Sequence, residues 1–138
     1  MKTLVALTAG ALIISSAAFG QQMSAGRGSL MTNLPSSSHT VTNWYKQDVY
    51  DANDNKIGQI SDVLVNPEGQ VNALIIGVGG FLGAGEKDVA VNFNAVKETT
   101  KNDKVYLTMD TTKDALKNAP GFKYDSGKTA WVPDNNSK

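Results

Sequence analysis

A glycine-rich segment at 77–85 (GVGGFLGAG) is the first candidate for chemistry, because glycine loops that open a helix can cradle phosphate groups. Counted from Gly77, the dinucleotide-binding fingerprint requires a glycine where Leu82 stands. Counted from Gly80, the phosphate-loop pattern meets Glu86 at the place of its lysine. The residues that follow also favour a strand rather than a helix. We therefore expect no nucleotide and no other cofactor at this segment.

The alternative is a wide connection whose glycines permit positive φ angles. Such a connection either tucks Phe81 and Leu82 into the core or displays them as an apolar tip for a partner, a lipid or a small ligand. Both alternatives are open at this point. The candidate partner-binding residues are Gly79, Gly80, Phe81, Leu82 and Gly83.

A second candidate is a calcium loop, because Asp51, Asn53 and Asn55 occupy the first, third and fifth places of its spacing. Lys56 stands where that loop needs glycine for its sharp turn, and Asp62 at the twelfth place is shorter than the bidentate glutamate. The flanking residues favour strands. The spacing therefore indicates a plain hairpin turn and no metal site.

No residue set indicates catalysis. Glu86, Lys87 and Asp88 adjoin one another, but acid–base chemistry needs two groups in different environments, so a solvated rim is the expected role. His39 is the only histidine and precedes the first strand. The chain has no cysteine, which excludes thiolate metal sites and thiol nucleophiles. We expect a protein that is not an enzyme.

Charge and aromatic content argue against nucleic-acid binding. Without its first twenty residues, of which only Lys2 is charged, the chain has 12 basic and 13 acidic side chains, a net charge of −1. That balance gives no electrostatic footprint for a phosphate backbone. Trp44, Tyr45 and Tyr50 resemble a base-stacking platform, but Lys46 is the only basic residue among them, so we expect them to pack in the core.

Several short strands are expected to form the domain. Residues 57–65 and 71–78 read as two strands joined by the turn 66–69 (NPEG), and 71–78 is apolar on both faces. Around 88–93 and 104–109, apolar and polar residues alternate as in strands with one wet face. A short helix is expected at 111–119, with Thr111 and Asp114 as a capping pair and Pro120-Gly121 ending it.

The first twenty residues have the layout of a secretory signal peptide: Lys2, an apolar run at 4–19, and small residues at its end. The run is interrupted and shorter than the roughly 20 residues that span a bilayer, so cleavage after Ala18 or Gly20 is expected rather than retention as an anchor. The expected product is periplasmic or secreted and does not span a membrane.

The chain resembles the PRC-barrel family in two blocks. The segment 49–65 (VYDANDNKIGQISDVLV) is similar to the opening hairpin of that domain, and 78–91 (VGGFLGAGEKDVAV) is similar to the glycine-rich segment of its exported proteobacterial members. Asn92 and Asn94 depart from that family, which often has proline and aspartate there. The resemblance implies a mainly β fold, a small PRC-type β-barrel of five to six short strands with a short C-terminal helix.

The expected organisation follows: a signal peptide at 1–20, a flexible leader at 21–42, the PRC-barrel domain at 43–123 and a C-terminal tail at 124–138, in which Trp131 and Val132 are candidates for docking on the domain. Relatives in the photosynthetic reaction centre and in a ribosome-maturation factor imply an adaptor role. We expect an interaction module with an unknown protein or envelope partner, with a homo-oligomer left open. The alternative is a carrier of a quinone or lipid in a cavity among Ile60, Leu64, Leu74 and Ile76.

Overall fold

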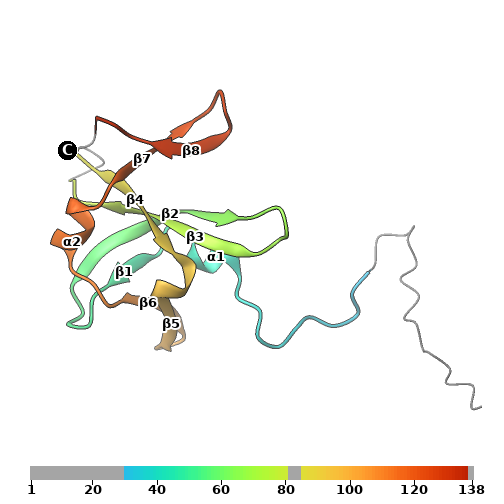
Figure 1. Cartoon of the computed structure of the whole chain (residues 1–138). Coiled ribbons are helices and arrows are strands. Elements are labelled where there is room, and N and C mark those ends of the chain that lie inside the picture. The colour runs from blue at the N-terminus through green and yellow to red at the C-terminus, as the bar shows by residue number, and fades with distance from the viewer. Residues whose placement is uncertain (1–29, 81–84, 137–138) are drawn as a thin grey trace, which may run out of the picture. The chain divides into compact units, whose positions relative to one another are not determined.

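The computed structural model describes residues 30–80 and 85–136 (Figure 1). The chain divides into two compact units, Met1–Pro35 and Ser36–Lys138. Of the first unit only 30–35 are described, all of them exposed, so the signal peptide expected at 1–20 lies outside the described residues. In the part of the chain that is described, no helix is long and apolar enough to cross a bilayer.

The second unit is built on one sheet of eight strands, in the order β5-β6-β1-β2-β3-β4-β7-β8, and the sheet does not close on itself. The mainly β fold that the sequence predicts is confirmed. The strands are β1 (Asp48–Tyr50), β2 (Lys56–Val65), β3 (Val71–Val78), β4 (Lys87–Asn92), β5 (Val96–Lys101), β6 (Lys104–Met109), β7 (Gly121–Asp125) and β8 (Ala130–Pro133).

Three short helical elements complete the unit: α1 (Val41–Trp44) before the first strand, a 3-10 turn η1 (Phe93–Ala95) between β4 and β5, and α2 (Lys113–Asn118) between β6 and β7. All strand pairs are antiparallel except β1 with β6, which run parallel with Val49 beside Leu107. That pair places the β5–β6 hairpin beside β1, the first strand in the sequence, so the strands curve around a common core.

The core fills the inside of this curved sheet. Its centre is β3, where Leu74, Ile76 and Val78 are buried, and the helices add Trp44 and Leu116. The remaining buried members come from the other strands: Val49, Ile57, Ile60, Val89, Val96 and Leu107. Burial of these side chains is the main stabilising contribution to a domain of this size.

The outer side of β2, β3 and β4 is partly covered as well. Ile75 is fully buried but is not a member of the core cluster, because alternation along β3 directs it to the opposite face. Trp131 of β8 donates a hydrogen bond from its indole nitrogen to Asp62 of β2 at 2.7 Å. The β7–β8 hairpin thus bonds to this second face, and β3 is apolar on both faces, as its sequence indicates.

Comparison with the expected elements shows where the sequence was informative. The strand 71–78 is found with the same bounds. The turn between β5 and β6 is tight, and both of its residues, Asn102 and Asp103, have positive φ angles. The predicted N-cap of the helix was wrong by one residue. Thr112, not Thr111, caps α2, and its hydroxyl oxygen accepts from the amide of Ala115.

Two segments differ from expectation more strongly. No strand was expected between 94 and 103, but Val96–Lys101 is strand β5, and it follows the 3-10 turn η1, which Asn92 caps. The tail expected after residue 124 continues β7 and forms β8, so the domain has eight strands rather than five or six.

Candidate functional site

The glycine-rich connection between β3 and β4 lies beside an open groove of about 450 Å³. Gly79 and Gly80 have φ angles of 75° and 74°, values at which side chains with a Cβ are strained, so the expectation of positive φ is confirmed for them. The other three candidate residues, Phe81, Leu82 and Gly83, lie outside the described residues. The groove is lined by Lys56, Ile57, Gly58, Gln59, Gly77, Gly79, Gly80, Glu86 and Lys113.

Glu86, Lys87 and Asp88, the charged residues at the start of β4, each make a different contact. The carboxylate of Glu86 occupies the space where Gly77 would carry a Cβ, so any larger residue on β3 at that point would displace the Glu86 side chain. The Lys87 ammonium donates to the carbonyl oxygen of Lys117 at 2.8 Å, and Asp88 accepts from the Ser61 hydroxyl at 3.1 Å. These contacts tie strands and α2 together at one rim.

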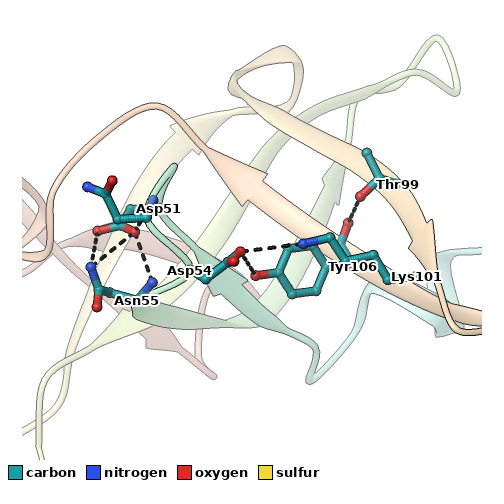
Figure 2. A network of polar contacts seen from close by, with 7 residues as sticks. Asp51, Asp54, Asn55, Thr99, Lys101 and Tyr106 are labelled. Carbon is teal, nitrogen blue, oxygen red and sulfur yellow. Dashed lines mark hydrogen bonds and ion pairs between the residues drawn. The ribbon is translucent and has the colours of Figure 1, made fainter.

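A second surface site includes Tyr50, the last residue of β1, and was not foreseen. Tyr50 and Tyr106 stack with ring centroids 4.6 Å apart and planes 13° from parallel. The Tyr106 hydroxyl donates to Asp54 at 2.6 Å, and Lys101 lies 3.4 Å from the same carboxylate oxygen and 4.0 Å from the Tyr106 ring centroid (Figure 2). We call Tyr50, Asp54, Lys101 and Tyr106 the outer-face cluster.

The outer-face cluster perturbs two ionisations. The hydrogen bond from Tyr106 and the charge of Lys101 lower the pKa of the Asp54 carboxyl below its ordinary value. The same bond, which favours the protonated phenol, raises the pKa of Tyr106 to about 12. Asp54 is therefore an anion and Tyr106 a neutral phenol across the physiological range, an arrangement that fixes geometry rather than moves a proton.

The cluster depends on the turn between β1 and β2. Asp51 accepts from the backbone amides of Asn53 and Asn55 at 2.8 and 2.9 Å, and the Asn55 amide lowers the pKa of its carboxyl (Figure 2). This turn puts Asp54 at a φ of 62° and directs it toward Tyr106. Asp62 lies elsewhere, bonded to Trp131. The geometry is that of the plain turn the sequence indicates.

His39 and Trp44 meet at a third place. The Trp44 indole donates to Glu98 of β5, His39 Nδ1 lies 3.1 Å from the same carboxylate oxygen, and Phe93 stacks on Trp44 at 4.9 Å. Trp44 is a core residue as expected, whereas Tyr45 is half exposed and Tyr50 belongs to the surface stack. Among the described residues, no group of three or more His, Asp or Glu side chains is arranged to hold a metal.

Sequence reasoning missed the outer-face cluster because its members are distant along the chain: Asp54 and Tyr106 are 52 positions apart. The available signal was the alternation in 104–109, which places Tyr106 on the wet face and Leu107 in the core. A tyrosine on the wet face of a strand, shortly after Lys101 and Lys104, is the residue to examine first.

Comparison with known protein families identifies most of the second unit. The family model for the PRC-barrel domain matches residues 38–116, which are 79 of the 138 residues. The match includes α1, strands β1 to β6 and most of α2, and it ends before the β7–β8 hairpin. No curated protein matches the chain.

Proposed function

The chain belongs to the PRC-barrel domain family, and from this premise we propose that it is a non-enzymatic interaction module of the periplasm that contacts a protein or envelope partner. The export part of the proposal is supported by the charge, apolar run and small residues at the start of the chain. The interaction part is supported by a surface site.

The observation that carries the proposal is the outer-face cluster. Its aromatic rings are held in place before any partner arrives, since Tyr106 is fixed by Tyr50 on one side, by Lys101 on the other and by Asp54 at its hydroxyl. Ordered tyrosines on a surface are typical anchors of interfaces, because little side-chain entropy is lost when they bind.

The surroundings of the cluster suit a broad contact. It borders two open grooves, of about 530 and 410 Å³, on either side of β6. Both are lined by mixed polar and apolar residues, among them Lys97, Thr108 and Met109 in the first and Gln47 and Lys104 in the second. Open, mixed surfaces of this kind fit macromolecular partners better than they fit a small substrate.

The carrier alternative has less support. Ile60, Leu74 and Ile76 are fully buried members of the packed core, and Leu64 is not in that cluster. The hollow that His39, Trp44, Val63 and Phe93 help to line measures about 40 Å³, which is room for about one water molecule and not for a quinone or lipid.

In-cell photo-crosslinking tests the interaction. A photo-crosslinking amino acid at Thr108, on the outer face, should give an adduct with a defined partner that is identified by mass spectrometry. A second substitution, Tyr106→Ala, should abolish the adduct because it removes the stacked anchor. The matched control is Tyr124→Ala, which removes an exposed tyrosine from β7. Melting curves of both variants establish that the domain is folded.

Adducts of the same kind and yield from Lys123, an exposed position on β7, would count against a specific surface and so against the proposal. Export is tested separately by fusing alkaline phosphatase to the C-terminus, since that enzyme is active only where its disulfides form. Activity that persists after deletion of residues 1–20 would contradict the periplasmic assignment.

A further inference from the structure

Strand β5 is an open edge of the sheet. It stands at one end of the strand order, and its only neighbour among the described strands is β6. The β5–β6 turn has two residues, Asn102 and Asp103, both with positive φ, so the flanking pair Lys101–Lys104 is hydrogen-bonded. Hydrogen-bonded pairs then recur at every second residue.

This register decides which backbone groups of β5 are free. Lys97, Thr99 and Lys101 direct their amide and carbonyl groups toward β6. Val96, Glu98 and Thr100 direct theirs away from the sheet, but the Val96 amide already donates to the Phe93 carbonyl at the end of η1. A partner strand would therefore find both backbone groups available at Glu98 and Thr100 and the carbonyl group at Val96, which permits strand addition.

The two sides of this edge differ in chemistry. On the inner side a groove of about 430 Å³ is lined by Trp44, Phe93 and Val96 together with polar residues, among them His39 and Glu98. On the outer side stand Lys97, whose ammonium has no hydrogen-bond or ion-pair partner among the described residues, and Lys101, which has Asp54. An added strand would thus meet a partly apolar surface on one face and positive charge on the other.

A second copy of the chain fits this edge poorly. In an antiparallel, two-fold pairing of β5 with β5, the register that centres on Glu98 sets two glutamates opposite each other. The two neighbouring registers set Lys97 opposite Lys97 or Lys97 opposite Lys101. Like charges directly across a sheet are destabilising, so pairing between the β5 strands of two copies is disfavoured.

We infer that β5 pairs with an extended peptide segment of a partner in which apolar residues alternate with polar ones and acidic residues are spaced four apart. Bound antiparallel, its acids face Lys97 and Lys101, and its apolar side chains lie along the Trp44 groove. The inference rests on the proposed function, because it specifies the class of partner. It extends the contact from the outer-face cluster, to which Lys101 belongs, onto the backbone.

The test uses the acetylated and amidated peptide VDVTVDVT and amide hydrogen exchange measured by NMR. In the free protein the amides of Glu98 and Thr100 should exchange faster than those of Lys97 and Thr99. At ten times its dissociation constant the peptide should slow those two amides by about tenfold and leave Val96, whose amide bonds to Phe93, and Lys97 and Thr99 nearly unchanged. Uniform slowing, or none with the peptide bound, overturns the inference.

Two matched controls separate backbone pairing from charge. Methylating the valine nitrogens of the peptide should abolish binding, whereas methylating its threonine nitrogens, which point away from β5, should not. Lys97→Glu should weaken binding at least fivefold, and Lys123→Glu on β7 should leave it unchanged. The lysine peptide VKVTVKVT should not compete; equal affinity for both peptides would overturn the acidic partner.

The two proposals fail in different ways. If Thr108 crosslinks to a defined partner while the peptide never protects β5, the interaction module stands and the edge inference is overturned. If the peptide protects β5 and the crosslinks are lost in Lys97→Glu, both are supported. If neither experiment yields binding, both are wrong.

Discussion

The two edges of the sheet, β5 and β8, are finished in opposite ways. β8 offers little to a partner strand. The hydrogen bond from the Asp134 amide to the Gly121 carbonyl fixes the register, in which the backbone groups of Trp131 and Pro133 point away from β7. Pro133 has no N–H to donate there. β5 presents the amides of Glu98 and Thr100 outward, whereas that of Val96 bonds to Phe93. The β8 edge thus lacks a donor at Pro133, whereas the β5 edge has outward amides and carries Lys97 and Lys101 beside them.

This difference coincides with the limits of the family. β5 lies inside the PRC-barrel match at 38–116, whereas β8 lies beyond it, in a hairpin that bonds to the second face of the sheet through Trp131 and Asp62. The hairpin thus bonds to the face of the sheet on which Ile75 is buried and ends the strand order, while the proposed binding surface belongs to the matched domain.

The largest effect is expected where β8 is attached. Trp131→Ala should lower the free energy of unfolding by about 3 kcal/mol, because it removes a large half-buried ring and leaves Asp62 without its indole donor. Trp131→Phe, which keeps most of the ring, should cost about 1 kcal/mol. Urea unfolding measures both. Equal and negligible losses would mean that the hairpin is not part of the cooperative unit.

A pH effect of intermediate size is expected on the β5 side. The pKa of Tyr106 is raised from its ordinary value near 10 to about 12, so its bond to Asp54 stabilises the fold fully below pH 10 and is lost as pH rises through 12. The pKa of Asp54 is lowered, so its contribution is present above about pH 4 and is lost as pH falls through the lowered value.

Phenolate absorbance measures the alkaline part. One of the four tyrosines should titrate near pH 12, and in Asp54→Asn its midpoint should move toward 10, since the charge that holds the proton is gone. Tyr106→Phe should remove that step altogether. If the step near pH 12 survives in Tyr106→Phe, it belongs to another tyrosine. The hydrogen bond between Tyr106 and Asp54 would then not hold the β5–β6 hairpin against the β1–β2 turn.

The smallest effect on stability is expected at Pro133, yet it tests the comparison most directly. Pro133→Val restores an outward N–H on β8 and should change the unfolding free energy by less than about 0.5 kcal/mol, as surface substitutions usually do. It should nonetheless increase concentration-dependent self-association in sedimentation experiments, because a second open edge has been made. An unchanged monomer would show that proline is not what closes β8.

The sequence predicted the strands whose burial leaves a pattern and missed those whose burial does not. β3 was found with its bounds because five consecutive residues from Leu74 to Val78 are buried. β5 was missed because only Val96 is buried in a stretch of lysine, glutamate and threonine, a composition that the open edge itself requires. β8 was assigned to a tail because its burial is partial and its length is four residues.

The candidate site divides in the same manner. Positive φ at Gly79 and Gly80 follows from residue type alone, so a local rule predicts it. The outer-face cluster follows from the parallel pairing of β1 with β6, which places Tyr50 and Tyr106 on adjoining strands. No local rule specifies a pairing between strands that far apart, and the second site was therefore invisible before the fold was known.

That parallel pair also sets an order in which the domain can fold. β1 ends at Tyr50 and its partner β6 begins at Lys104, so closing the sheet there requires the whole intervening chain. Contacts of such high sequence separation form late, after the local hairpins. A chain that is synthesised or threaded N-terminus first must keep one side of β1 unpaired until β6 has emerged. During that interval the newborn domain has a third exposed edge, which a chaperone would be able to bind.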